Sequence, residues 1–304
     1  MRQPVVVGVD GTSDSLIAAG WAAGEARRLD APMVLLHGHV PQFGYNRMLS
    51  GDIEDERRAA RRLLDDSLAW VREHFADVEV SGEVVAQPEA DLLVERGQGA
   101  LMLVLGSRRP GPVTGFLLGS VGLRVLGRAA CPVVMIRGGT ASRRPQDGEI
   151  VAGVPQAEEA EGVLDFAFRT AAARGAPLRA ARAWNLPTLF TYEPGLIGRS
   201  DELGGLEEVH RHDLATLLEP WRRRYPQVTV VEHVELGPAS EMLVTLAAAA
   251  QLLVVGRRAR PRSRYLGHVA HATLHFADAA IALVPHRVDE DADDADDEGD
   301  DTDE

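Results

Sequence analysis

Short apolar runs alternate with longer segments of helical periodicity along the first half of the chain. Runs rich in Val, Ile, Leu and Met occupy residues 5–9, 33–40, 78–85, 101–105 and 132–136, and helical spacing fills 13–29, 52–75, the stretch that Pro88 opens and the segment after Gly119. Almost wholly apolar runs such as 101–105 are typical of strands covered on both faces. The pattern predicts the order β-α-β-α-β-α-β-α-β.

The second half repeats this order with an offset of 145 to 150 residues. Gly8 corresponds to Gly153, Gly106 to Gly256, and Gly119 to Gly267. Coincident landmarks at a nearly constant offset indicate a duplicated domain. Alternating strands and helices of this length predict two doubly wound, five-stranded, mostly parallel α/β sheets with right-handed crossovers, in tandem. We expect a first domain at 1–137, a linker at 138–148, a second domain at 149–287 and a disordered acidic tail at 288–304.

The net charge of −14 is concentrated at the end of the chain. Residues 288–304 carry 12 of the 46 acidic residues and no basic one, which leaves 34 acids against 32 basic residues elsewhere. A self-repelling tail of this kind serves solubility or docks a protein partner. Cys131 is the only cysteine, which excludes an intrachain disulfide, and we expect it to be buried. The absence of a basic stripe, of a signal peptide and of long apolar runs predicts a soluble, cytoplasmic protein that binds neither nucleic acid nor membrane.

The strand exits are the place to look for a ligand, because doubly wound sheets bind ligands beyond the carboxyl ends of their strands. Asp10 follows the first strand, and a Gly/Pro-rich loop runs from Gly106 to Gly119-Ser120, where a helix begins. Glycines permit close approach of the backbone, a helix N-terminus presents free amides, and the Ser120 hydroxyl adds a donor. Arg108 and Arg109 add charge, so the loop suits phosphate.

The segments VGVDGTSDS, LLHGH, LGSRRPGPVTGFLLGSVG and RAACPVVMIR, in this order and at these distances, resemble the universal stress protein family over residues 1–137. The second half is similar in outline. The resemblance implies an adenine nucleotide alpha hydrolase-like fold and a site for ATP, with or without Mg²⁺. Family members that bind ATP carry a Gly-x2-Gly-x9-Gly-Ser/Thr motif, in which Gly106, Gly119 and Ser120 match.

The resemblance also implies roles for single residues. Asp10, flanked by Gly8 and Val9, matches an acid that contacts adenosine, and Gly38 occupies a small adenine-side position. Leu105 and Val121 match apolar or backbone contacts beside the base and phosphates. Arg109 replaces the middle glycine of the motif. If that position requires positive φ, the side chain costs on the order of 1 kcal/mol. If its φ is ordinary, the guanidinium is free to lie along the polyphosphate.

The second domain departs further from the family pattern. Pro155 stands at the position of Asp10, Ala259 at the middle glycine and His268 at the serine. We therefore expect a degenerate site there and one nucleotide per chain. His268, His271 and His275 share a helix face without a companion carboxylate or cysteine, which favours packing or solvent exposure over a metal. His210 and His212 are expected at the surface, and His37 as a partly buried, hydrogen-bonded core histidine.

No nucleophile elbow and no second carboxylate near the glycine loop are recognisable, so the sequence predicts a protein that is not an enzyme, with ATP turnover at most slow and incidental. The leading hypothesis is a stress-response regulator that binds ATP in its first domain and alters a surface for an unknown protein partner. The alternative is a nucleotide-independent interaction module. We also expect the final strands, 132–136 and 281–284, to pair as an intrachain pseudo-dimer, because an apolar edge strand needs a partner. A further homodimer would use another surface.

Overall fold

The structure is a computed structural model that describes residues 2–40, 53–107, 119–137, 148–185, 200–259 and 266–287. Arg108, Arg109, all of the linker except Gly148, and the acidic tail lie outside the described residues. The expectations about them remain predictions.

The first half contains five strands and four helices in the predicted order. They are β1 Val5–Gly8, α1 Ser13–Arg28, β2 Met33–Gly38, α2 Ile53–His74, β3 Val80–Val85, α3 Glu89–Gly97, β4 Met102–Ser107, α4 Ser120–Arg128 and β5 Val133–Arg137. Local signals explain several boundaries. The Thr12 hydroxyl caps α1 by accepting a hydrogen bond from the backbone N–H of Ser15, and Pro88 directly precedes α3.

The second half repeats this succession. Its elements are β6 Glu149–Gly153, α5 Ala157–Arg174, β7 Leu178–Trp184, α7 Ser200–Arg224, β8 Val230–Leu236, α8 Ala239–Ala247, β9 Ala250–Ala259, α9 His268–Phe276 and β10 Ala280–Arg287. Gly175 ends α5 in the left-handed conformation with φ of 62°, as glycine does after many helices. The duplication that the sequence landmarks predict is therefore visible in the order of the elements.

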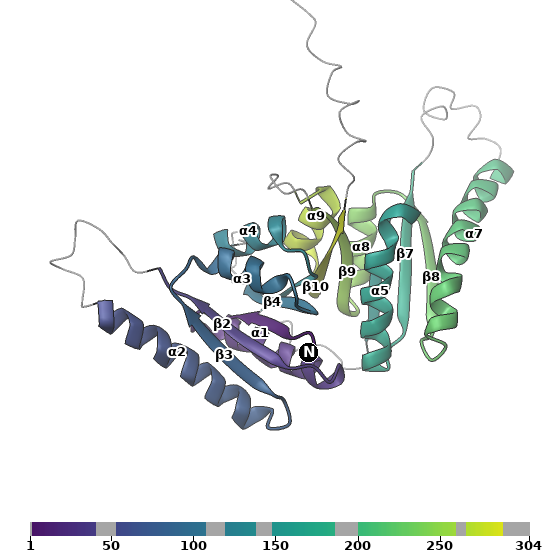
Figure 1. The fold of residues 1–304 in the computed structure, drawn as a ribbon. Coiled ribbons are helices and arrows are strands. Elements are labelled where there is room, and N and C mark those ends of the chain that lie inside the picture. The colour runs from purple at the N-terminus through teal and green to yellow at the C-terminus, as the bar shows by residue number, and fades with distance from the viewer. Residues whose placement is uncertain are drawn as a thin grey trace, which may run out of the picture.

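The strands form one sheet in the order β3-β2-β1-β4-β5-β10-β9-β6-β7-β8. Within each half the described pairings are parallel, and the reversal of strand order beside β1 or β6 confirms the doubly wound fold. The two halves meet where β5 and β10 pair antiparallel, with Val134 opposite Ala282. The predicted pairing of the final strands is thus confirmed, and it joins the two five-stranded sheets into one of ten strands (Figure 1).

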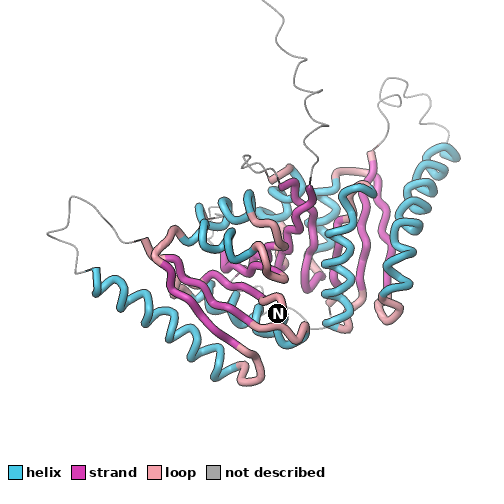
Figure 2. Tube along the Cα trace, in the orientation of Figure 1, coloured by secondary structure: helices cyan, strands magenta, loops and turns pink. Residues whose placement is uncertain are grey.

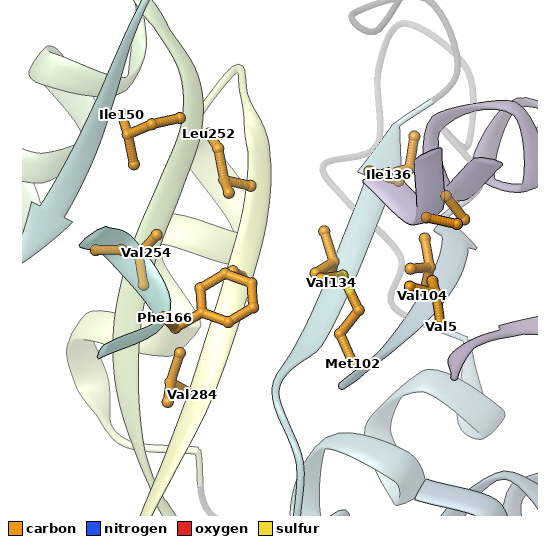
Figure 3. Close-up of a cluster of buried hydrophobic side chains, with 14 of the residues drawn as sticks. Val5, Met102, Val104, Val134, Ile136, Ile150, Phe166, Leu252, Val254 and Val284 are labelled. Atoms are coloured by element: carbon orange, nitrogen blue, oxygen red, sulfur yellow. The ribbon is translucent and has the colours of Figure 1, made fainter. Parts of the chain in front are cut away.

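Helices flank the sheet on both faces (Figure 2). The buried residues of α1, α2, α5 and α7 belong to one apolar cluster, and those of α3, α4, α8 and α9 to another. Successive strand residues alternate between these clusters, since Val5 and Val7 contribute to the first and Val6 to the second. Figure 3 shows the first cluster, where Val104 and Val134 of the first half and Phe166, Leu252 and Val254 of the second are buried.

Charged side chains also cross between the halves. Arg174 of α5 lies 2.8 Å from a carboxylate oxygen of Glu25 of α1, and both side chains are buried. Arg137 of β5 donates to the carbonyl oxygens of Leu274 and, at 2.5 Å, Ala277 at the end of α9. Arg257 of β9 donates in turn to the carbonyl of Ala129 at the end of α4. These contacts fix the two halves against one another.

Candidate functional site

The turn between β1 and α1 holds Asp10 at the exit of the strand. Asp10 Oδ1 accepts hydrogen bonds from the backbone N–H of Thr12 at 3.0 Å and from its hydroxyl at 2.5 Å. Gly11 has φ of 77°, which few other residues tolerate, and Ser15 ties the turn to the helix by donating to the carbonyl of Thr12 at 2.9 Å. The Asp10 carboxylate is exposed, and the hydrogen bonds of its own turn hold it in one orientation.

The exit of β4 and the start of α4 face this turn. A Cβ at Gly106 would lie 2.5 Å from the carbonyl oxygen of Asp14, so glycine is required where α1 passes the end of β4. Gly119 precedes α4, and no side chain among the described residues caps the helix. The first amides of a helix have no intrahelical acceptor, so the described part of the chain leaves those of α4 as donors.

These elements enclose a pocket of about 440 Å³. The predicted residues that line it are Gly8, Asp10, Leu105, Gly106, Gly119, Ser120 and Val121. The sequence predicts that Gly8 and Asp10 share a site with residues 105–106 and 119–121, and the structure brings these residues into one pocket. Their roles toward a ligand stay predictions.

Two predicted residues do not line the pocket. Val9 is fully buried in the core below it. Gly38 is explained by packing, because a Cβ there would lie 2.4 Å from Cα of Glu89 at the start of α3. The absence of a side chain at Gly38 lets α3 approach β2. It thereby positions Glu89.

Glu89 is the residue that sequence reasoning missed. It lines the same pocket as Asp10. Burial raises the pKa of Glu89 to about 7, and the charge of Asp10 adds to the rise. The expectation that no second carboxylate lies near the glycine loop is therefore wrong. The available signal was positional, since Pro88 directly precedes a helix and places residue 89 at the exit of the third strand.

The described lining of this pocket is acidic. Asp10, Asp14 and Glu89 contribute carboxyl groups, and the described lining includes no arginine. The protonated form of Glu89 reduces this charge near neutral pH. The hydroxyls of Thr12 and Ser15 already donate to Asp10 and to the carbonyl of Thr12. The donors that the described lining leaves for a ligand are the hydroxyls of Ser107 and Ser120 and the first amides of α4. The pocket therefore offers acceptors at the β1 side and donors at the α4 side.

The second half has a cavity in the corresponding place, of about 700 Å³. Pro155, Gly256, Gly267 and His268 line it, and Ala259 ends the strand nearby. Gly267 has φ of 78° at the start of α9. Loss of the family residues has therefore not closed the second cavity. Whether it binds a nucleotide remains a prediction, and the expected answer is that it does not.

The remaining candidates have structural explanations. His37 Nδ1 lies 2.8 Å from the carbonyl oxygen of Val9, which confirms the expected hydrogen-bonded histidine, and Cys131 is buried as predicted. His210 lies partly at the surface, half-buried against Trp184 with ring centroids 5.0 Å apart. Across the described residues, no three His, Cys, Asp or Glu side chains gather in a way that would hold a metal. Nor does any helix in the described ranges have the length and apolar character needed to span a bilayer.

The fold and the pockets first define a class: a doubly wound α/β protein of two similar halves, each with a ligand-sized cavity at its strand exits. A model described as "Universal stress protein family" matches residues 1–137 and 148–285. Universal stress protein Rv2005c of Mycobacterium tuberculosis is 32% identical over 291 residues, which cover 92% of this chain and 96% of the relative. Universal stress protein Rv2623 of the same organism is 28% identical over 263 residues, which cover 84% and 86%.

A solved universal stress protein from Archaeoglobus fulgidus has the same fold, with a TM-score of 0.66 at 14% identity, over 93% of this chain and 98% of that one. The chain therefore belongs to the universal stress protein family, with two family domains in tandem.

Proposed function

We propose that this protein is an adenine-nucleotide-binding stress-response regulator, and that ATP binds in the pocket of the first half. The observation that carries the proposal is the convergence of an anchored acceptor and a set of free donors on one pocket. Asp10 is fixed by Thr12 on one side, and the N-terminus of α4, which no described side chain caps, lies on the other. A volume of about 440 Å³ lies in the range of small-molecule sites.

Each part of the pocket suits one part of the nucleotide. The Asp10 carboxylate is an acceptor for ribose hydroxyls. The α4 amides and the Ser120 hydroxyl suit phosphate oxygens, because a helix N-terminus favours anions. Leu105, Val121 and Met135 supply apolar contact for the base. The base, sugar and phosphate of one ligand therefore each find matching chemistry.

The carboxyl group of Glu89 affects this ligand through its charge. A protonated Glu89 removes one negative charge beside a polyanion, whereas an ionised one repels it. We expect ATP to bind with proton uptake near neutral pH. We propose binding as the functional event, with occupancy altering a surface for a protein partner, and any turnover of ATP slow and incidental.

The acidity of the described lining favours one competing function. Three carboxyl groups and no arginine among the described lining residues weaken an argument for a polyphosphate site. In that reading the chain is a nucleotide-independent interaction module that offers protein surfaces and its acidic tail. Measured ATP affinity separates the two functions.

Calorimetric titration with ATP, with and without Mg²⁺, tests the proposal in matched variants. Asp10→Ala removes the acceptor and should weaken binding at least tenfold, whereas Asp77→Ala, at an exposed aspartate outside the pocket, should leave it unchanged. Gly119→Val should abolish binding, because its side chain crowds the donors at the start of α4. It should not reduce stability, since a Cβ at Gly119 meets no described atom within 4 Å. Pro155→Ala should keep the stoichiometry near one nucleotide per chain.

Each failure has a distinct meaning. Wild-type protein that binds no ATP would favour the interaction module. ATP binding that survives both Asp10→Ala and Gly119→Val would place the nucleotide elsewhere. Two nucleotides per chain would overturn the expectation of a degenerate second site.

A further inference from the structure

The cavity of the second half differs from the first pocket in the charge of its walls. Strand registers relate the two halves, since Val5 pairs with Met33 as Ile150 pairs with Leu178. At this offset Pro155 replaces Asp10. Pro88 and Pro238 precede α3 and α8, so Ala239 occupies the place of Glu89. Two of the three carboxyl groups of the first pocket are therefore absent from the second cavity.

A cation takes part in the wall instead. Arg182 on β7 stands at the register position of His37 on β2. Its Nη2 donates to the carbonyl oxygen of Pro155 at 2.8 Å, and the residue lines the cavity. A guanidinium has five N–H donors, and this is the only hydrogen bond that Arg182 makes among the described residues. Donors of a half-buried cation therefore remain for a ligand.

Among the described residues, two acids line this cavity, Asp213 and Glu159, and each has a cationic or imidazole neighbour. Asp213 of α7 interacts electrostatically with Arg182 and partly offsets the lowering of its pKa by burial. Glu159 lies 3.4 Å from Nε2 of His286. Arg182 remains charged at physiological pH, because an arginine pKa lies far above neutrality.

An apolar wall and a flat aromatic surface complete the cavity. Met242, Leu243, Val255 and Leu266 line it on the side of α8 and α9, and Trp184 lines it opposite, beside His210. The buried indole N–H of Trp184 has no acceptor in the described part of the chain, so the wall includes one unsatisfied donor. The first amides of α9 are additional donors, because none of the side chains that the structure describes caps this helix.

We infer that the cavity of the second half binds a small organic anion with a flat apolar body, a carboxylate or a phosphate monoester, and excludes adenine nucleotides. The anionic group pairs with Arg182 and the helix donors, and the body lies among Trp184, Met242 and Leu243. A nucleotide finds no carboxylate at Pro155 to accept from its ribose. The inference is independent of whether the first pocket binds ATP.

Three naphthalene probes test the charge requirement by calorimetry on the full chain. 2-Naphthoate and 2-naphthyl phosphate carry the anion, and 2-naphthamide is its neutral counterpart. We expect one anionic probe per chain to bind, with roughly tenfold or greater preference over the amide. Preference between the two anions identifies the head group. AMP should not displace the bound probe. Absence of binding by both anions, or equal affinity for the amide, would overturn the inference.

Matched variants locate the site. Arg182→Gln should lower the affinity for the anionic probe by roughly tenfold to a hundredfold. Arg179→Gln is the matched control and should have little effect, because Arg179 lies on the same strand but pairs with Glu149 outside the cavity. Ala239→Glu restores the carboxyl group that the first half carries at Glu89, and it should lower the affinity for the anionic probe far more than Ala239→Gln does. If the two Ala239 variants lowered this affinity equally, the size of the new side chain and not its charge would be the cause, and the charge argument would be refuted. Thermal unfolding of each variant checks that Arg182→Gln still folds.

Discussion

Replacing Glu89 by Gln should make the stability of the protein less sensitive to pH and should raise the affinity for ATP under alkaline conditions. The pKa of Glu89 rises from 4.5 in the unfolded chain to about 7 in the pocket, because the half-buried side chain loses part of its water and lies near the charge of Asp10. Between these values the folded protein holds a proton that the unfolded chain has lost, so stability falls as pH rises and the loss is complete above pH 7. The corresponding free energy is at most about 3 kcal/mol, and water in the open pocket reduces the expected effect to about 1–2 kcal/mol.

Urea unfolding at pH 4.5 and pH 8 measures this difference. Glu89→Gln and wild type should have similar free energies of unfolding at pH 4.5, and the variant should be more stable by about 1–2 kcal/mol at pH 8. Glu73→Gln, at an exposed glutamate of α2, is the matched control and should show no such divergence. Carbon-13 NMR of the carboxyl groups provides the direct measurement, and in Asp10→Ala the pKa of Glu89 should fall but remain raised by burial. A Glu89 pKa near 4.5 in wild type would refute the reasoning.

Two other variants test the packing that positions the pockets. Glu25→Ala should destabilise the protein by about 3–5 kcal/mol, because it leaves the buried Arg174 without its carboxylate, whereas Glu79→Ala in an exposed pair with Arg2 should cost under about 1 kcal/mol; equal costs in urea unfolding would contradict this. Gly38→Val should cost about 1–3 kcal/mol or more and weaken ATP binding, since its Cβ would overlap the backbone of α3, whereas Gly99→Val has open space; a Gly38→Val protein as stable as Gly99→Val would contradict the packing explanation.

The order of the elements could be predicted because it depends on local periodicity. Buried strands such as β4 and β5 are short apolar runs, and capping residues such as Thr12 lie beside the helices they begin. The pairing of β5 with β10 could also be predicted, because an apolar strand at a sheet edge requires a partner and the duplicated chain supplies one.

The chemistry of the pockets was less accessible, since it depends on contacts between residues far apart in sequence. Asp10 and Glu89 are 79 residues apart, and although each follows the exit of a strand, that position alone does not indicate that both carboxyl groups line one pocket. The glycine at position 38 was interpreted through a ligand, whereas the structure explains it by the approach of α3. The sequence also showed what the second site had lost, such as the acid replaced by Pro155, but not that Arg182 would line the cavity that remained.

The joint between the halves explains why the two cavities keep fixed positions. Arg137 and Arg257 each cross to the other half and donate to carbonyl oxygens at the C-terminal end of a helix, where the helix dipole favours a cation. Both arginines are buried in the joined halves, so these carbonyl oxygens replace the water that burial removes from the two cations. The helices they contact, α9 and α4, are those whose N-termini open onto the cavities. Each half therefore secures the far end of the helix that forms the other half's binding site.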